Sequence, residues 1–215
     1  MAHDISGTRF DIGRITMVPT ATILLVFDVM ALAHLAASGH GIIRWPGALL
    51  TAAFYVLMIW YYLRRGPARA TTNSITARAV AIVATWAAFI IPLLHGAPPG
   101  PVQQGVSDVL LLVGAAWAVW SLRFLGRNLS VIAQAREVAD RGPYRWVRHP
   151  LYTGEIVSSL GLTLAAHSLA AIAVWLGFCA LQAYRAVREE QLLLAVLPGY
   201  GANRIRTAAL LPGIF

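Results

Sequence analysis

Long apolar stretches separated by short polar connections dominate the sequence. A helix needs about 20 mainly apolar residues to cross about 30 Å of hydrocarbon. Six stretches approach this length, namely Met17–Ala37, Trp45–Leu63, Ala79–Leu94, Val106–Leu122, Leu151–Ala166 and Leu169–Tyr184. The last two are short and only His167 and Ser168 separate them, which predicts a tight helical hairpin. We therefore expect an all-α, polytopic integral membrane bundle of five to six transmembrane helices, five complete spans being the alternative to six.

The composition agrees with a membrane protein. Of the 215 residues, 58% are hydrophobic and only 12% are charged, whereas a soluble domain carries about 25% charged residues. Such a chain has too few polar side chains to cover a water-soluble globule. The composition excludes a soluble enzyme and a disordered chain.

The charged residues indicate a topology. All 17 basic residues are arginine, and the net charge is +8. All but Arg44 lie in the N-terminal segment, in alternate connections or in the tail: Arg9 and Arg14; Arg64, Arg65, Arg69 and Arg78; Arg123, Arg127, Arg136, Arg141, Arg145 and Arg148; Arg185, Arg188, Arg204 and Arg206. The positive-inside rule then predicts that both termini and the arginine-rich connections face the cytoplasm of a cell membrane. It explains the positive charge without a nucleic-acid partner.

The stretch from Arg141 to Glu155 combines charge, aromatic rings and a helix start. Gly142 and Pro143 predict a turn. Pro150 suits the first position of a helix, because a backbone N–H at that position has no hydrogen-bond partner within the helix and proline lacks that N–H. Arg148, His149 and the free N–H groups of that helix start would form a polar pocket at the membrane edge. The alternative is an anchoring loop whose arginines bind lipid phosphates.

A second group of charges ends the last apolar stretch. Arg185 and Glu189 are four residues apart, so they share one face of a helix, and Glu190 follows directly. An ordinary ion pair at the membrane boundary would give the same pattern. Carboxylates at this depth are costly unless they bind something, which favours a functional site.

The two groups together resemble a known family. The string Gly142-Pro-Tyr-x-x-Val-Arg-His-Pro-x-Tyr-x-Gly154, followed by Arg185-x-x-x-Glu-Glu190 and Leu210-Leu-Pro-Gly213, resembles the isoprenylcysteine carboxyl methyltransferases and the related phospholipid methyltransferases. The resemblance covers about Leu122 to Phe215. It implies S-adenosylmethionine bound in a cytoplasmic pocket formed by helix ends and the C-terminal tail. The sequence has no G-x-G-x-x-G dinucleotide motif and no P-loop.

The resemblance also implies roles for individual residues. The cofactor would be bound by Tyr144, His149, Pro150, Leu151, Tyr152 and Glu189, with further contacts from Val138 and Ala139 next to Arg136, where the family usually has histidine. Arg185 would be catalytic by facing the methyl acceptor. We expect residues 1–105 to form an N-terminal transmembrane part and residues 106–215 the catalytic part.

The function expected from this resemblance is S-adenosylmethionine-dependent methyl transfer to a lipophilic acceptor. Carboxyl O-methylation of a prenylated or similar acid is the first choice because a guanidinium such as Arg185 can bind a carboxylate bidentately. Phospholipid amine N-methylation is the alternative, with Glu155 or Glu190 as the base. A non-enzymatic lipid-binding protein is a third possibility. Membrane lipids are the expected surroundings, and no metal is expected because the sequence has no cluster of Cys and His ligands.

Overall fold

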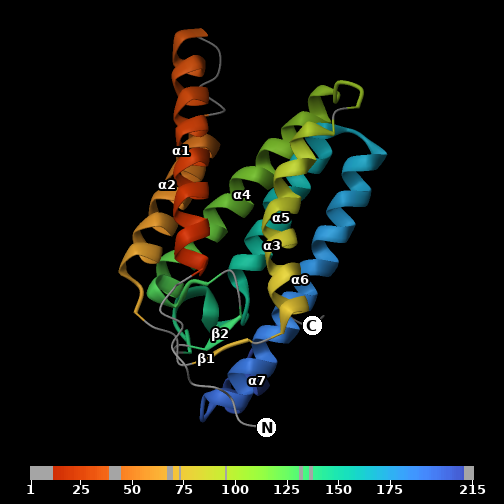
Figure 1. Cartoon of the computed structure of the whole chain (residues 1–215). Helices are drawn as coiled ribbons and strands as arrows, with labels where there is room; N and C mark the ends of the chain where they lie inside the picture. The colour runs from red at the N-terminus through yellow and green to blue at the C-terminus, as the bar shows by residue number, and fades with distance from the viewer. Residues whose placement is uncertain are drawn as a thin grey trace.

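Six long helices build the part of the chain that the structure describes, as the apolar pattern predicts (Figure 1). The computed structural model describes residues 12–38, 45–66, 70–72, 74–94, 96–130, 133–135 and 138–210. The elements are α1 (Ile12–Ser38), α2 (Trp45–Arg64), β1 (Ala70–Thr71), α3 (Ile75–Ile90), η1 (Ile91–Leu93), α4 (Pro101–Leu125), η2 (Gly126–Asn128), β2 (Gln134–Ala135), η3 (Gly142–Arg145), α5 (Pro150–Ala166), α6 (Leu169–Val196) and α7 (Tyr200–Arg206). Among these described residues the fold is all-α apart from two strands of two residues each.

Five helices are long and apolar enough to cross a membrane within the described part of the chain: α1, α2, α3 with the turn after it, α4 and α6. Helix α5 has 17 residues, about 25 Å at 1.5 Å per residue, which is shorter than the hydrocarbon core. Helix α6 continues to Val196, beyond the predicted end at Tyr184. The five-span alternative therefore describes the bundle, with α5 as the shorter member of the predicted hairpin.

Local signals in the sequence define the hairpin. Pro150 occupies the first turn of α5, and α5 ends at His167, whose φ of 47° and ψ of 47° place it in the left-handed region. The Ser168 side chain then accepts a hydrogen bond from the Ala171 N–H and caps α6. A left-handed residue and a serine cap reverse the chain within two residues.

Helices α4 and α5 pack closely because small residues face each other. A Cβ atom on Gly154 would lie 2.8 Å from the Ala118 nitrogen, and one on Gly114 would lie 2.3 Å from the Ser158 nitrogen. The Ser107 hydroxyl donates to the Gly161 carbonyl at 2.5 Å across the same interface. Such stripes of small residues allow close approach of membrane helices. The motif glycine Gly154 thus has a packing role.

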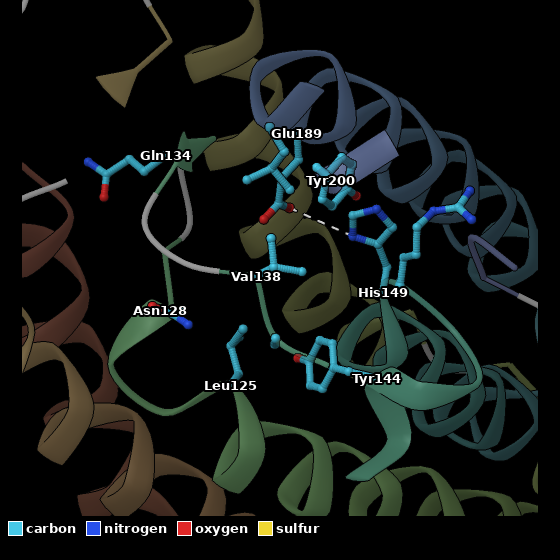
Figure 2. A pocket seen from close by; sticks show the side chains of 11 residues that line it. Leu125, Asn128, Gln134, Val138, Tyr144, His149, Glu189 and Tyr200 are labelled. Carbon is cyan, nitrogen blue, oxygen red and sulfur yellow. Dashed lines mark ion pairs between the residues drawn. The ribbon is translucent and has the colours of Figure 1, made fainter. Parts of the chain in front are cut away.

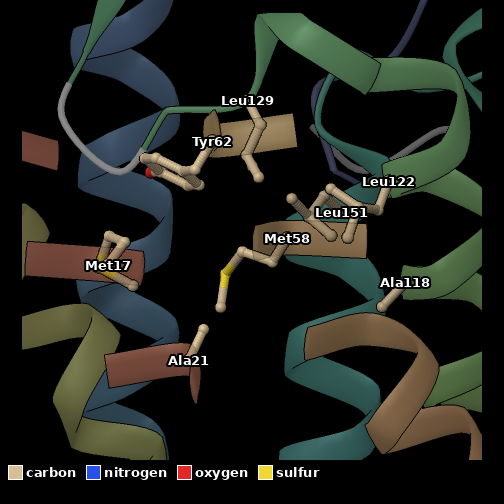
Figure 3. Close-up of a cluster of buried hydrophobic side chains, with 8 residues drawn as sticks. All are labelled: Met17, Ala21, Met58, Tyr62, Ala118, Leu122, Leu129 and Leu151. Carbon is tan, nitrogen blue, oxygen red and sulfur yellow. The ribbon is translucent and has the colours of Figure 1, made fainter. Parts of the chain in front are cut away.

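An apolar core joins the N-terminal helices to α4 and α5 (Figure 3). Its buried members are Met17 and Ala21 of α1, Met58 and Tyr62 of α2, Ala118 and Leu122 of α4, Leu129 and Leu151. The buried Arg65 guanidinium donates to the Leu129 carbonyl at 2.9 Å. Leu151 therefore lies in the core of the bundle at the start of α5.

The arginine-rich connections gather at one end of the bundle, which is the lower end in Figure 1. Strand β1 pairs antiparallel with β2, with Ala70 opposite Ala135 and Thr71 opposite Gln134. This pairing ties the α2–α3 connection to the α4–α5 connection. Helix α7 lies at the same end. The arginine-rich connections, which alternate with arginine-poor ones along the sequence, thus lie together at one end of the bundle. Both hollows described next lie at this end.

Candidate active site

His149 lies at the centre of the polar end. It is the N-cap residue of α5, and its buried ring stacks on the Tyr152 ring with centroids 5.4 Å apart and an interplanar angle of 5°. Its Nδ1 lies 3.8 Å from Glu189 Oε2, and its Nε2 lies 3.3 Å from Glu190 Oε1. The imidazole therefore lies between two carboxylates that adjacent residues of α6 supply.

A hollow opens beside this ring (Figure 2). Its empty space, counted together with the open mouth, is about 470 Å³. The residues that line it are Leu125, Asn128, Gln134, Val138, Ala139, Tyr144, Arg148, His149, Glu189, Leu193 and Tyr200. In Figure 2, Glu189, Tyr200 and His149 gather on one side while Leu125 and Tyr144 approach from the other. We call this space the first hollow.

Two tyrosines of the first hollow are held in the protonated state by their surroundings. Burial raises the pKa of Tyr144 well above its ordinary value, and the negative charge of Glu189 raises it further. Burial likewise raises the pKa of Tyr200, with the carboxylate of Glu190 adding to the effect. Both phenols therefore keep their O–H at neutral and moderately alkaline pH and offer polarised rings and hydroxyl groups to a ligand.

A second, smaller hollow lies between α3, α5 and α6. Its polar lining consists of Tyr152, Tyr184, Arg185, Arg188 and Glu189, and its small apolar lining of Ala77, Ala81 and Ala133. The Tyr152 hydroxyl donates to Glu189 Oε2 at 2.9 Å, and the Arg185 guanidinium lies over the Tyr152 ring, 4.7 Å from its centroid. Glu189 lines both hollows, so the two are neighbours with one shared carboxylate.

Hydrogen bonds link Arg185 to Gln182 and Gln182 to Glu155. Arg185 Nη1 donates to Gln182 Oε1 at 2.8 Å, and Gln182 Nε2 donates to a carboxylate oxygen of Glu155. Arg185 is buried. These hydrogen bonds fix the guanidinium of Arg185 in position at the second hollow.

The structure brings most of the predicted site residues together. Val138, Ala139, Tyr144, His149 and Glu189 line the first hollow, and Tyr152, Arg185 and Glu189 line the second. The side chains of Pro150 and Leu151 line neither, because Pro150 is buried at the helix start and Leu151 belongs to the core. Arg136 lies outside the described residues.

Sequence reasoning missed part of the lining. Leu125, Asn128, Gln134 and Leu193 carry no motif signal, because an apolar or amide side chain at a pocket wall can be of several types. Arg148, by contrast, was expected in this pocket beside His149, and it lines the first hollow. Ala77 and Ala81 come from α3, far from the motif in the sequence.

The part of the chain that supplies this site is similar to a known protein family. Residues 102–198 match the family described as phospholipid methyltransferase. No curated protein matches the chain. The phospholipid methyltransferase region covers α4 to α6 and thus all the predicted site residues, and methyltransferases of this family use S-adenosylmethionine. The expectation of an integral membrane methyltransferase that uses this cofactor is therefore confirmed.

Proposed function

We propose that the first hollow binds S-adenosylmethionine and that the chain transfers its methyl group to the amine of a phospholipid headgroup. The observation that carries the proposal is the lining of the first hollow by His149, Tyr144 and Glu189, within a region that matches the phospholipid methyltransferases. S-adenosylmethionine supplies an electrophilic methyl group on a sulfonium. The site should lie on the cytoplasmic side, where the arginine-rich connections are expected.

The donor set fits this cofactor. The side chain of Glu189 is 28% exposed, so its carboxylate can accept hydrogen bonds from ribose hydroxyls or from the methionyl ammonium. The rings of Tyr144 and Tyr200 offer the faces that attract a cation by about 1 kcal/mol. Displacement at a sulfonium needs alignment of the two reactants more than acid catalysis. The rigid, buried His149–Tyr152 stack supplies a fixed wall for that alignment.

The second hollow fits the headgroup of an acceptor. It brings together the guanidinium groups of Arg185 and Arg188 and the carboxylate of Glu189 along one face of α6. A phosphate that is joined to an amine complements this arrangement, because the phosphate pairs with the guanidinium groups and the amine with the carboxylate. The match with phospholipid methyltransferases favours the same acceptor class.

An amine acceptor must lose a proton before it attacks, and the structure suggests which carboxylate receives it. Glu155 accepts a hydrogen bond from Gln182, and Glu190 pairs with Arg148, His149 and Arg204. Neither lines a hollow. Glu189 lines both, so we assign it the proton-accepting role that the sequence suggested for Glu155 or Glu190.

Carboxyl O-methylation of a prenylated acid is the second candidate, and Arg185 favours it. The buried guanidinium lines the second hollow and could bind a carboxylate bidentately. The Glu189 carboxylate on the same hollow opposes this choice, because two carboxylates repel each other.

A methyl-transfer assay separates the candidates. The purified protein is placed in vesicles that contain phosphatidylethanolamine or in vesicles of phosphatidylglycerol doped with a farnesylated cysteine acid, together with methyl-labelled S-adenosylmethionine. We expect label in the amine-lipid fraction. If the labelled methyl group is found only in the farnesylated acid, the reaction is carboxyl O-methylation. If calorimetry shows no binding of S-adenosylhomocysteine to the wild-type protein, the enzyme proposal fails and a lipid-binding role replaces it.

A further inference from the structure

The C-terminal segment 200–210, which we call the tail segment, is fastened to the start of α5. The backbone N–H of Arg148 donates to the Ala208 carbonyl at 2.8 Å, and that of His149 donates to the Ala209 carbonyl at 3.0 Å. Val147 and Ala208 form a parallel β-bridge. The residue that lines the first hollow from this segment is Tyr200. The position of the tail segment therefore decides whether Tyr200 and the α5 start face the same ligand.

One carboxylate organises the charged side of this junction. Glu190 Oε1 lies 2.7 Å from Arg148 Nε and 3.3 Å from His149 Nε2, and Glu190 Oε2 lies 3.2 Å from Arg204 Nε. Arg148 also donates to the backbone carbonyls of Arg204 and Thr207, and so caps the end of α7. Glu190 thus joins two guanidinium groups and an imidazole, which come from the α5 start and from the tail segment.

Glu190 itself does not line either hollow, whereas Arg148, His149 and Tyr200 line the first. Arg148 and Glu190 are almost fully buried, with side chains 9% exposed each. Removal of the negative charge would leave Arg148 and Arg204 facing each other without compensation, and breaking a buried pair in this way is strongly unfavourable. The tail segment is the part that can move away in response, because Arg204 is 55% exposed.

We propose that Glu190 is a positioning residue of the cofactor site. It acts through Arg148, His149 and Arg204, and it fixes the tail segment so that Tyr200 closes the first hollow. The inference rests on the proposed function of that hollow. Glu189 and Glu190 then have separate roles, since Glu189 faces the ligand and Glu190 fixes the tail segment that carries Tyr200.

The first experiment uses Glu190→Gln, which removes the negative charge of the side chain and keeps its size and shape. Calorimetry measures S-adenosylhomocysteine binding to the wild type and to Glu190→Gln in detergent. We expect at least tenfold weaker binding by Glu190→Gln, with kcat at saturating S-adenosylmethionine within about threefold of the wild type. Equal affinity would overturn the proposal. No binding by the wild type would defeat the proposed function instead, so the two failures are distinguishable.

The second experiment separates positioning from direct contact. Val147→Cys and Ala208→Cys are combined with Cys179→Ala, and the engineered disulfide fastens the tail segment covalently, because bridged β residues lie at a distance that a disulfide can span. In the Glu190→Gln background, oxidation should restore binding to within about threefold of the wild type, and reduction should abolish the rescue. A disulfide proven by mass spectrometry without rescue would contradict the proposal.

A third variant covers the case in which Glu190→Gln does not fold. Arg204→Met removes the most exposed partner, and its binding should weaken by about three- to tenfold while the thermal midpoint stays within a few degrees. Arg206→Met is the matched control, because no ion pair of Arg206 is present among the described residues. Equal effects of the two substitutions would overturn the proposal.

Discussion

Two adjacent carboxylates at the end of α6 differ in what they face. Successive residues on a helix point about 100° apart, so Glu189 is directed to the hollows while Glu190 is directed to the tail segment. The sequence shows only a pair of acidic residues. The family resemblance assigned cofactor binding to Glu189, but it gave no sign that Glu190 contacts Arg148, His149 and Arg204.

Glu189→Ala tests the central residue of the site. The carboxylate lines both hollows and accepts the Tyr152 hydroxyl, so its loss should reduce S-adenosylhomocysteine binding below detection by calorimetry. Asp108→Asn is the control, since it removes a charge near the start of α4, at the opposite end of the bundle. Retained affinity in Glu189→Ala would show that the cofactor is bound elsewhere.

Tyr152→Phe tests the hydrogen bond that orients Glu189. The ring that stacks on His149 is kept, while the hydroxyl that donates to Glu189 at 2.9 Å is lost. A hydrogen bond to a charged group contributes about 1.5–3 kcal/mol, so we expect about tenfold weaker cofactor binding. Tyr61→Phe, which loses an exposed 3.4 Å hydrogen bond, should bind normally. An unchanged affinity in Tyr152→Phe would mean that the hydroxyl does not orient the carboxylate.

Arg185→Gln tests the acceptor side. Arg185 lines the second hollow and not the first, so kcat/KM for the lipid acceptor should fall by about a hundredfold while the Kd of S-adenosylhomocysteine changes less than threefold. Arg123→Ala, at an exposed end of α4, serves as the control for loss of a membrane-edge cation. A parallel loss of cofactor affinity would place Arg185 in the cofactor site.

At the level of the elements, the sequence predicted the helices well and their packing poorly. Length and apolar content identify each span, and proline or serine at a helix start marks its beginning. Hydropathy ended α6 at Tyr184, whereas the four-residue spacing of Arg185 and Glu189 indicated that it continues, as it does to Val196. Neither the β1–β2 pairing nor α7 was predicted, since two paired strand residues and a seven-residue helix leave no periodic signal.

Two glycine-to-alanine substitutions test the α4–α5 interface. Gly154→Ala places a methyl group 2.8 Å from the Ala118 nitrogen, whereas Gly177→Ala on α6 meets nothing within 4 Å. Overpacking costs about 1–3 kcal/mol, while alanine in an open helix position gains up to about 1 kcal/mol over glycine. Thermal unfolding in detergent should show a lower midpoint for Gly154→Ala and an equal or higher one for Gly177→Ala. The same direction of change for both would refute the close-packing role.

At the level of the whole molecule, the candidate site is built from segments that are far apart in the sequence. The recognised motif supplied His149, Tyr152, Arg185 and Glu189, because each needs a particular chemistry that few residue types provide. The alanines of α3 that line the second hollow could not be predicted, since α3 reaches the site only by packing on α6. The arginine pattern nonetheless predicted which connections lie at one end, because segregation of charge follows from alternate crossing of the membrane.

The orientation of the bundle gives the last prediction. If the arginine-rich end faces the cytoplasm, a cysteine at Ile205 in α7 should be protected in intact cells, and a cysteine at Val102 at the start of α4 should react with a membrane-impermeant maleimide. Both positions are strongly exposed, at 89% and 80%, and both variants carry Cys179→Ala, so reactivity reports sidedness and not burial. Permeabilised cells should label both variants equally, which controls for expression. Labelling of the Ile205 position alone in intact cells would place both hollows outside the cytoplasm, where intracellular S-adenosylmethionine could not reach them.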